Sequence, residues 1–498
     1  MIDIDSFDFM INTFNLGTST AEKDPLLETA KIETQEFYDL DTDRIDIVRG
    51  IKGAGKTALY RLMYFLRDYM VKNDNRFCIF GVEATGDPVF LQFRDRFEHF
   101  SNVEFENFWI LYLLLLIRSQ MENNEHLKII IQSERERLDA LWDNLGVPLP
   151  GKQSGLYQFV KQIISKFRGI KSATAGIAVK QEANGELSYT PEITAEFDAS
   201  LSEKPKYISD VKTTLCDILS KYKIKIWVML DRLDEVFPRR TKQEEYGLKG
   251  LLKAAYNLSE KELRIKIFLR DDIIEQLASS SEGFTALTHV TDRSTATMSW
   301  SRSNILFLIV KRVFSHDFFV SYFGIDVSLL EKEPRYREEC FYKIFPQRVG
   351  KLATLDWIMN VLSDGNGIVT PRDVIDLFNI AKSIQFKEFQ IQRKEMEHLL
   401  NPESFKDALE KLSKEKHDKF LIAEFPHMRE NIIRLEDTYS IHNSKSLEKI
   451  YGSNWKTVAS DFKSIGLLEH DPKKNYYRIP KLWVKGMRVT QGKAKECD

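Results

Sequence analysis

Hydrophobic and polar residues follow two periods along the first 300 residues, and this pattern predicts an α/β domain. Short apolar runs typical of buried strands begin near residues 45, 76, 224, 264 and 296. Between these runs, apolar residues recur every three to four positions, which is typical of amphipathic helices. The helical segments are 56–71, 104–121, 125–145, 155–166 and 243–258. Strands that alternate with helices in this way predict a doubly wound parallel sheet with helices on both faces.

A long insertion, residues 123–205, separates the second predicted strand from the third. Within it, 172–180 and 186–190 flank the pair Asn184-Gly185. An Asn-Gly pair between two strand-like runs is a strong signal for a hairpin, because both turn residues need positive φ. The insertion therefore carries its own β-hairpin.

The pattern changes after residue 300, where strand signals disappear and helices rich in aromatic residues take over. The first of these helices places Ile305, Leu308, Ile309 and Arg312 on one face. Near the end of the chain, helices at 446–451 and 454–464 precede strands at 467–470 and 476–479, with a polar turn at 471–475. This helix–helix–hairpin order predicts a winged helix. The predicted domains are a lead-in that serves as a linker or lid (1–44), the α/β domain with its insertion (45–300), a helical lid domain (301–400), a helical linker (401–434), the winged helix (435–490) and a tail (491–498).

Composition excludes several classes of protein. The chain carries 72 basic and 74 acidic residues, a net charge of −2, so any nucleic-acid binding must be local. Its four cysteines are too scattered for a zinc or disulfide framework, and no signal peptide is evident, which favours the cytoplasm. The longest apolar run, residues 109–117, falls far short of the roughly 20 residues that a membrane span needs. We expect no contact with a membrane.

The stretch GIKGAGKT, residues 50–57, fits the phosphate-binding pattern G-x-x-x-x-G-K-[ST]. Its glycines permit backbone N–H groups to point at a ligand, and the helix that follows adds its positive dipole end. The lysine can reach the β- and γ-phosphates of ATP, and the threonine hydroxyl can ligate Mg²⁺. A simple glycine turn is the alternative, which the strand before the loop and the helix after it disfavour. The candidate nucleotide-binding residues of the loop are Gly50, Gly53, Ala54, Gly55, Lys56, Thr57 and Ala58.

A second motif, IKIWVMLDRLDE at residues 224–235, is an apolar strand that ends in carboxylates. In parallel sheets ligands bind at the carboxyl ends of strands, and we expect this strand beside the loop strand. Asp231 is the candidate Mg²⁺ ligand together with Thr57. Asp234 and Glu235 are candidates to orient or deprotonate the attacking water, and which of the two acts stays open. Alone, such a cluster is usually a solvated loop or a helix N-terminus.

Two arginines complete the predicted site. Arg270 ends the strand 264–269, where it would face the γ-phosphate as a sensor; the alternative is a surface arginine paired with Asp271 or Asp272. Arg372 follows Pro371 at a predicted helix start and could reach phosphates from there, or simply be a surface residue. In the predicted winged helix, Lys456, Lys463, Lys473 and Lys474 are candidate contacts to double-stranded DNA. The alternative is a winged helix that only docks on protein.

Taken together, GIKGAGKT, VMLDRLDE, the IFLRDD strand tip, the TPRD helix start and the winged-helix order resemble AAA+ and STAND-type P-loop ATPases. The LDRLDE form is similar to the acidic signature of NACHT-type STAND proteins, and the domain order resembles Orc/Cdc6-like initiators. A poorly characterised group of prokaryotic P-loop ATPases, often discussed with antiviral defence, shares LDRLDE, the strand-tip arginine and GxxTPRD. Two departures stand out. Arg232 replaces the small residue that NACHT proteins place after the metal aspartate, and the long insertion is not a common AAA+ feature.

The resemblance implies an ATP- and Mg²⁺-dependent molecular switch that oligomerises and controls a partner effector, such as a nuclease encoded elsewhere. The alternative is a DNA-binding initiator or loader that acts through its winged helix. ATPases of this kind gain a stimulating arginine from a neighbouring subunit or complete the site within one chain. The candidates for the first arrangement are Arg293, Arg302, Arg348 and Lys351.

Overall fold

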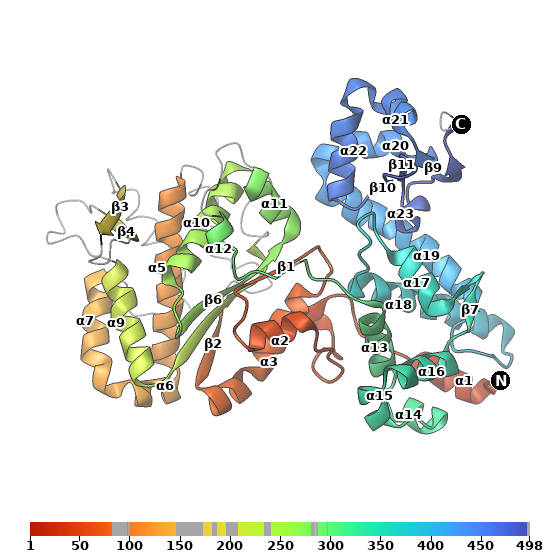
Figure 1. The fold of residues 1–498 in the computed structure, drawn as a ribbon. Helices are drawn as coiled ribbons and strands as arrows, with labels where there is room; N and C mark the ends of the chain where they lie inside the picture. The colour runs from red at the N-terminus through yellow and green to blue at the C-terminus, as the bar shows by residue number, and fades with distance from the viewer. Residues whose placement is uncertain are drawn as a thin grey trace. The chain divides into compact units, whose positions relative to one another are not determined.

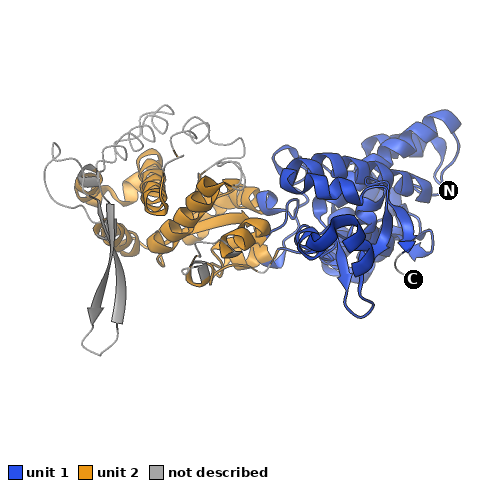
Figure 2. Ribbon diagram, turned by 90° about the horizontal axis from the view of Figure 1, so that it is seen from above, with its two compact units in different colours: residues 1–35, 50–58, 298–498 blue, residues 36–49, 59–297 orange. Residues whose placement is uncertain are grey.

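The structure, a computed structural model, forms two compact units (Figure 2). Unit 1 contains residues 1–35, 50–58 and 298–498, and unit 2 contains residues 36–49 and 59–297. The residues described are 1–81, 97, 100–145, 173–181, 187–195, 208–233, 241–279, 284, 287–295 and 297–495.

Unit 2 is built around a parallel sheet (Figure 1). Its strands are β1 (Ile47–Gly50), β2 (Arg76–Gly81), β5 (Lys225–Leu230) and β6 (Leu263–Arg270), in the order β1-β6-β5-β2. Its larger helices are α3 (Lys56–Asp74), α5 (Asn102–Asn123), α7 (Arg135–Leu145), α9 (Ile208–Lys221) and α10 (Lys242–Leu258). Shorter elements are α2 (Gln35–Asp41), α6 (Glu125–Ile130), η3 (Gln132–Glu134), α11 (Asp271–Ser279) and α12 (Leu287–Val290).

Helices cover both faces of this sheet, as the alternating pattern predicts. On one face, α5 and α10 pack against β2, β5 and β6 and bury residues such as Trp109, whose Nε1 donates to the carbonyl oxygen of Gly247 at 2.8 Å. On the other face, Tyr60 of α3 makes edge-on ring contacts with Phe80 and Phe268, at centroid distances of 5.2 and 5.6 Å. The mixed α/β class and the parallel sheet are therefore confirmed.

The strand order corrects one prediction. We expected the Asp231 strand, β5, beside the loop strand, β1, but β6 lies between them. Sequence periodicity identifies strands and says nothing about their neighbours, which are chosen by packing over the whole sheet.

A second correction concerns the strand expected at 296–300. Residues 297–300 form no strand; instead Ser294 makes an isolated parallel bridge to Ile47. Residue 296 lies outside the described residues, as do the predicted helix 155–166 and the turn Asn184-Gly185. The hairpin of the insertion is present as β3 (Ala173–Gln181) and β4 (Leu187–Ala195), paired antiparallel from Ala173↔Ala195 to Gln181↔Leu187.

Unit 1 is mostly helical (Figure 1). Its longer helices are α1 (Ile4–Thr13), α13 (Arg302–Val313), α16 (Pro334–Ile344), α17 (Thr354–Leu362), α18 (Pro371–Gln392), α19 (Pro402–Lys416), α21 (Ser444–Tyr451) and α22 (Trp455–Ser464). Shorter helical elements are η1 (Ala21–Lys23), α14 (Asp317–Phe323), α15 (Val327–Lys332), the π-helix η5 (His417–Ile422), η6 (Pro426–Met428), α20 (Arg429–Leu435), η7 (Gly452–Asn454) and α23 (Lys481–Val484). Its strands are β7 (Arg348–Val349), β8 (Leu352–Ala353), β9 (Tyr439–His442), β10 (Glu469–Asp471), β11 (Tyr476–Arg478) and β12 (Thr490–Lys493).

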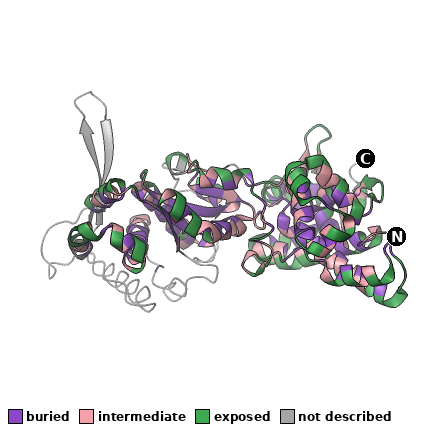
Figure 3. Cartoon of the chain, turned by 90° about the horizontal axis from the view of Figure 1, so that it is seen from below, coloured by how far each residue is buried: buried purple, intermediate pink, exposed green. Residues whose placement is uncertain are grey.

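One hydrophobic core runs through unit 1 from α1 to the segment before β12 (Figure 3). The apolar face predicted for α13 is buried, since Ile305, Leu308, Ile309 and Arg312 are each at most 5% exposed. The helix start predicted at Pro371 is also correct: α18 begins there, with the Thr370 hydroxyl capping the Asp373 N–H at 3.2 Å.

Residues 1–35, within the lead-in expected to be a linker or lid, contribute the buried helix α1 to unit 1. Phe7, Met10, Ile11 and Phe14 are fully buried in the unit 1 core, and the Phe7 ring packs at a tilt against that of Phe389 with centroids 4.6 Å apart. Their spacing of three, four and seven is a helical stripe, so the signal was present but only two turns long.

The C-terminal segment contains the predicted helices and hairpin, with Glu469 opposite Arg478. Two strands that the pattern did not indicate, β9 and β12, complete a sheet of order β10-β11-β9-β12. Both are short, and β12 (TQGK) contains no alternating apolar residues. The division into lid, linker and winged helix stays a prediction. Among the described residues, no helix combines the length and apolarity that crossing a bilayer requires.

Candidate nucleotide site

The glycine loop joins β1 to α3 and has the backbone geometry that its sequence requires. Gly53 and Gly55 adopt φ values of +89° and +104°, a region that side chains with a Cβ rarely enter. The Ala54 N–H donates to the carbonyl of Ile51 at 3.2 Å, which tightens the turn. The α3 helix then begins at Lys56, so its N-terminal N–H groups lie at the end of the loop.

The Lys56 side chain folds back over the loop. Its Nζ donates to the carbonyl oxygens of Gly50 at 2.7 Å and of Ile51 at 3.0 Å. The ammonium is therefore at the loop itself, where a phosphate chain would need a cation. Gly50 is tightly surrounded, because an added Cβ would lie 3.0 Å from the Cβ of Met298.

Three side chains distant in sequence line the loop within unit 1. Trp300 Nε1 donates to the Ala54 carbonyl at 2.7 Å, and its ring lies beside Gly55. At Gly53, an added Cβ would meet the Cβ of Arg372 at 3.2 Å and the hydroxyl of Thr370 at 3.3 Å. The structure thus brings Arg372 and Thr370, both in the TPRD helix start, to the loop. Trp300 had no sequence signal that could have marked it.

A further cation of the loop, Lys52, forms an ion pair with Glu424. The side chain of Lys52 is 35% exposed and that of Glu424 is 16% exposed, so the pair is partly shielded from water. No pattern in the sequence distinguished either residue.

In unit 2, Asp231 follows β5 directly and is 4% exposed. The next residue, Arg232, has φ +56°, so the chain turns sharply after the carboxylate. Asp234 and Glu235 lie outside the described residues, and their proposed roles stay predictions.

Arg270 is the last residue of β6 and is 6% exposed. Its guanidinium binds Asp272 through two hydrogen bonds, Nε to Oδ1 at 2.9 Å and Nη2 to Oδ2 at 2.8 Å. The pairing with a neighbouring aspartate that the alternative foresaw is present, but the arginine is buried and not at the surface. A sensor role stays a prediction. The strand that carries it does lie beside β5, as expected.

A second ion pair occupies the same end of the sheet. Arg49 of β1 donates from Nε to Asp271 Oδ1 at 3.1 Å. Nearby, burial raises the pKa of Glu275, and the negative charges of Asp271 and Asp272 add to this shift. Arg49 lies directly before the glycine loop, and no pattern in the sequence distinguished it.

Each unit carries an oxygen donor of the kind that Mg²⁺ takes when it is bound with a nucleotide. In the part of the chain that the structure describes, no group of three or more His, Cys, Asp or Glu residues could form a metal cage. Mg²⁺ bound to phosphates needs only one or two protein oxygens and keeps several waters. The hydroxyl of Thr57, in the first turn of α3, and the carboxylate of Asp231 are ligands of this kind.

Two of the four cations proposed to act on a neighbouring subunit are engaged in ion pairs within their own unit. Arg293 donates to Asp46 Oδ2 at 2.6 Å. Arg302 binds Glu338 and Asp356, each at 2.7 Å, and these bonds raise its pKa.

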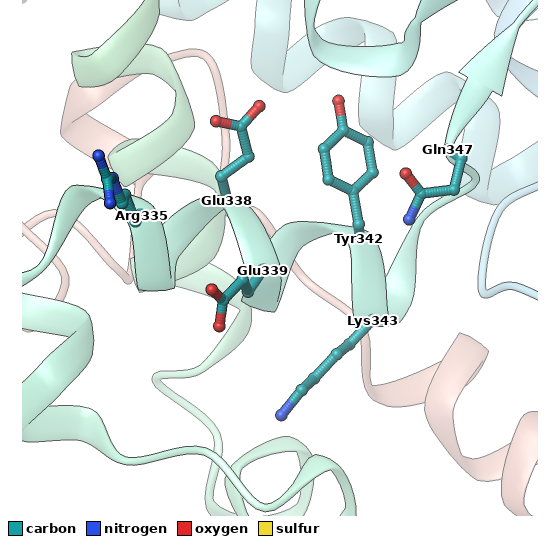
Figure 4. A pocket seen from close by; sticks show the side chains of 6 residues that line it. All are labelled: Arg335, Glu338, Glu339, Tyr342, Lys343 and Gln347. Carbon is teal, nitrogen blue, oxygen red and sulfur yellow. The ribbon is translucent and has the colours of Figure 1, made fainter.

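Glu338 lines an open pocket of about 600 Å³ together with Arg335, Glu339, Tyr342, Lys343 and Gln347 (Figure 4).

The other two cations, Arg348 and Lys351, are exposed on the β7–β8 hairpin. The four lysines proposed to contact DNA, Lys456, Lys463, Lys473 and Lys474, are also exposed, on α22 and in the β10–β11 turn.

No protein-family model matches the chain. Over 387 residues, which is 75% of its length, it is 24% identical to the putative transposon gamma-delta 80.3 kDa protein of Escherichia coli K12. That match covers 47% of the Escherichia coli protein, so the chain spans about half the length of this relative.

Two solved structures resemble the chain at 12% sequence identity and a TM-score of 0.39. One is the ORC2 protein of Aeropyrum pernix in its ADPNP-ADP complexes, with 91% of this chain and 90% of that chain covered. The other is the Walker-type ATPase paby2304 of Pyrococcus abyssi, with 92% and 96% covered. Likenesses at this TM-score are too weak to carry a conclusion about the chain.

Proposed function

We propose that this protein binds ATP with Mg²⁺ at the glycine loop and hydrolyses it, as a molecular switch of the AAA+/STAND type. The observation that supports this most is the loop itself, with Gly53 and Gly55 at positive φ, a helix starting at Lys56, and the Lys56 ammonium over the loop. This arrangement supplies backbone N–H groups, a helix dipole and a cation to one phosphate chain.

The remaining residues take roles that follow from their chemistry. Thr57 and Asp231 would hold Mg²⁺, whose charge offsets that of the β- and γ-phosphates. Arg372, beside Gly53, would add a guanidinium to the phosphates, and Arg270 would exchange its bond with Asp272 for the γ-phosphate. Asp234 or Glu235 would accept the proton of the attacking water.

Release of inorganic phosphate from ATP, with and without Mg²⁺, tests this proposal. We expect slow, Mg²⁺-dependent turnover in the wild-type chain. Glu235→Gln or Asp234→Asn should keep ATP binding and slow hydrolysis, because removing a base spares the contacts of the ground state. If both variants turn over like the wild type, neither carboxylate is the base. If the wild type neither binds nor hydrolyses ATP, the proposal fails.

The wider role that we propose is regulatory: the ATP-bound chain assembles as a homo-oligomer and controls an effector protein, such as a nuclease, in prokaryotic antiviral defence. The exposed Arg348 and Lys351 support this role, because a trans-acting cation must be accessible. Light scattering with and without a non-hydrolysable ATP analogue is the test. A larger mass with the analogue supports assembly, and a monomeric mass in both conditions, with activity per chain independent of concentration, excludes it.

A second candidate function, an initiator or loader that binds double-stranded DNA, is favoured by the charge of the C-terminal segment. Residues 439–495 contain twelve Lys and Arg against four Asp and Glu, although the whole chain has a net charge of −2. Replacing Lys456, Lys463, Lys473 and Lys474 by Ala should weaken binding to all DNA sequences alike and reduce its dependence on salt. Absence of measurable DNA binding by the wild type at low salt would exclude this function.

A further inference from the structure

The ion pair between Lys52 and Glu424 ties the glycine loop to a distant segment of unit 1. Lys52 is the third residue of the loop motif, directly before Gly53, and its partner follows the π-helix η5. The two residues are 372 positions apart, so this contact exists only because of the tertiary fold. Single π-helical turns are rare and are often found at functional sites.

The same segment, residues 416–424, also contacts the first turn of α18, which lies beside the loop. Lys416, at its start, binds Asp373 at 2.6 Å. Asp373 lies in the first turn of α18, where its N–H is capped by Thr370, the residue whose hydroxyl lies beside Gly53. Segment 416–424 therefore holds the loop at Lys52 and the start of the Arg372 helix at Asp373.

At its other side, segment 416–424 packs on the C-terminal part of unit 1. Phe420 stacks on Trp483 of α23, with ring centroids 6.0 Å apart, and Lys416 lies 5.1 Å from the same tryptophan ring. His417 Nε2 lies 2.9 Å from Glu436 Oε1. A change in how this segment is attached to the loop would thus alter its packing against α23.

We propose that Lys52 is a second phosphate-binding cation of the loop and that Glu424 competes with the nucleotide phosphates for it. This inference rests on the proposed ATP site. A triphosphate carries several negative charges, and in a partly shielded site it offers Lys52 a stronger partner than one carboxylate. Glu424 therefore lowers nucleotide affinity, and bound ATP loosens segment 416–424 from the loop.

The test is equilibrium binding of a fluorescent, non-hydrolysable ATP analogue with Mg²⁺ to the full chain. Glu424→Gln should tighten binding roughly five- to tenfold, because the competing charge is gone and the side-chain shape is kept. Lys52→Met should weaken binding roughly tenfold, and in that background Glu424→Gln should change affinity by less than about twofold. Glu424→Asp, which keeps the charge, should bind like the wild type.

Glu415→Gln is the matched control, because Glu415 is 53% exposed on α19 and pairs with Lys419. The affinity of this variant for the analogue should equal that of the wild type. Binding by Glu424→Gln that is equal to or weaker than wild type would overturn the proposal. Equal tightening in the presence and absence of Lys52 would also overturn it, because the carboxylate would then act on the ligand without Lys52. Failure of the wild type to bind the analogue would instead reject the ATP site itself.

Discussion

The two ends of the unit 2 sheet both carry buried charges, but they differ in what those charges do. Toward the N-terminal ends of β1 and β6, Lys266 is fully buried and binds Asp43 at 2.5 Å and Asp46 at 2.7 Å. Arg264 and Arg293 bind the same two aspartates. All three cations bind the same two carboxylates, which lie on one short segment of chain before β1.

At the opposite end, the charged side chains lie at the carboxyl ends of the strands, where β1 continues into the glycine loop. Asp231 and Arg270 end neighbouring strands, and the pairs Arg270–Asp272 and Arg49–Asp271 are made by residues at or just beyond the strand ends. In parallel sheets this is the end at which ligands bind. Burial and pairing of charge therefore do not by themselves indicate a binding site; a position at the carboxyl ends of the strands is the further indication. Changes at the first end should cost stability, and changes at the second should cost activity.

The largest expected effect is on stability, from Lys266→Met. Lys266→Met removes the fully buried ammonium that binds both Asp43 and Asp46, whose side chains are only partly exposed, and leaves them to the two arginines alone. This should cost roughly 3 kcal/mol of unfolding free energy. Urea unfolding followed by tryptophan fluorescence measures it. Lys261→Met is the control, since Lys261 is exposed just before β6. A loss no larger than that of the control would show that the network is not a stability element.

At the other end, Asp231→Asn should leave the unfolding free energy nearly unchanged and reduce Mg²⁺-dependent turnover about 100-fold, because an amide is a poor ligand for Mg²⁺. Steady-state ATP hydrolysis during a Mg²⁺ titration is the measurement. Asp68→Asn, on a side chain of α3 that is 80% exposed, is the control and should behave as wild type. Normal turnover in Asp231→Asn would remove the carboxylate from the metal site.

A smaller effect is expected from Arg270→Ala, which should reduce turnover about tenfold if the arginine contacts the γ-phosphate. Asp272→Asn distinguishes the two roles considered for Arg270, a contact to the γ-phosphate and an ion pair with Asp272. If Arg270 serves the phosphate, releasing it from Asp272 should keep or raise turnover. If Arg270 acts only as the partner of Asp272, both variants should lose activity to the same extent.

The smallest effect concerns pH. Burial tends to raise the pKa of Asp46, but the charges and hydrogen bonds of Lys266 and Arg293 outweigh it, so the pKa lies below the ordinary value of 3.8. A carboxylate with a lowered pKa stabilises the fold above its unfolded pKa and loses this contribution as pH falls through the folded value. The stability gap between wild type and Asp46→Asn should therefore be constant from pH 7 to 5 and shrink below about pH 4. A gap independent of pH down to 3 would contradict this.

How much the sequence could predict depended on the range of the interaction. The strands β1, β2, β5 and β6 and the glycine loop between β1 and α3 follow from local spacing, and the structure has these elements where they were predicted. The binding roles of the loop residues stay predictions. The neighbours of each strand did not follow, since β6 between β1 and β5 is a property of the whole sheet. Trp300 on Ala54 and Glu424 on Lys52 join residues 246 and 372 positions apart, for which no periodicity exists.

The central claim is that the glycine loop binds ATP, and the most direct test is equilibrium binding of ATP with Mg²⁺ to the wild type and to Lys56→Ala. We expect the substitution to weaken binding roughly 100-fold, because it removes the cation that lies over the loop. The melting temperature should stay unchanged, since Lys56 lies in neither hydrophobic core. Lys72→Ala, on the exposed side of α3, should bind ATP like the wild type. Equal ATP affinity in the wild type and Lys56→Ala, with both chains folded, would contradict the account.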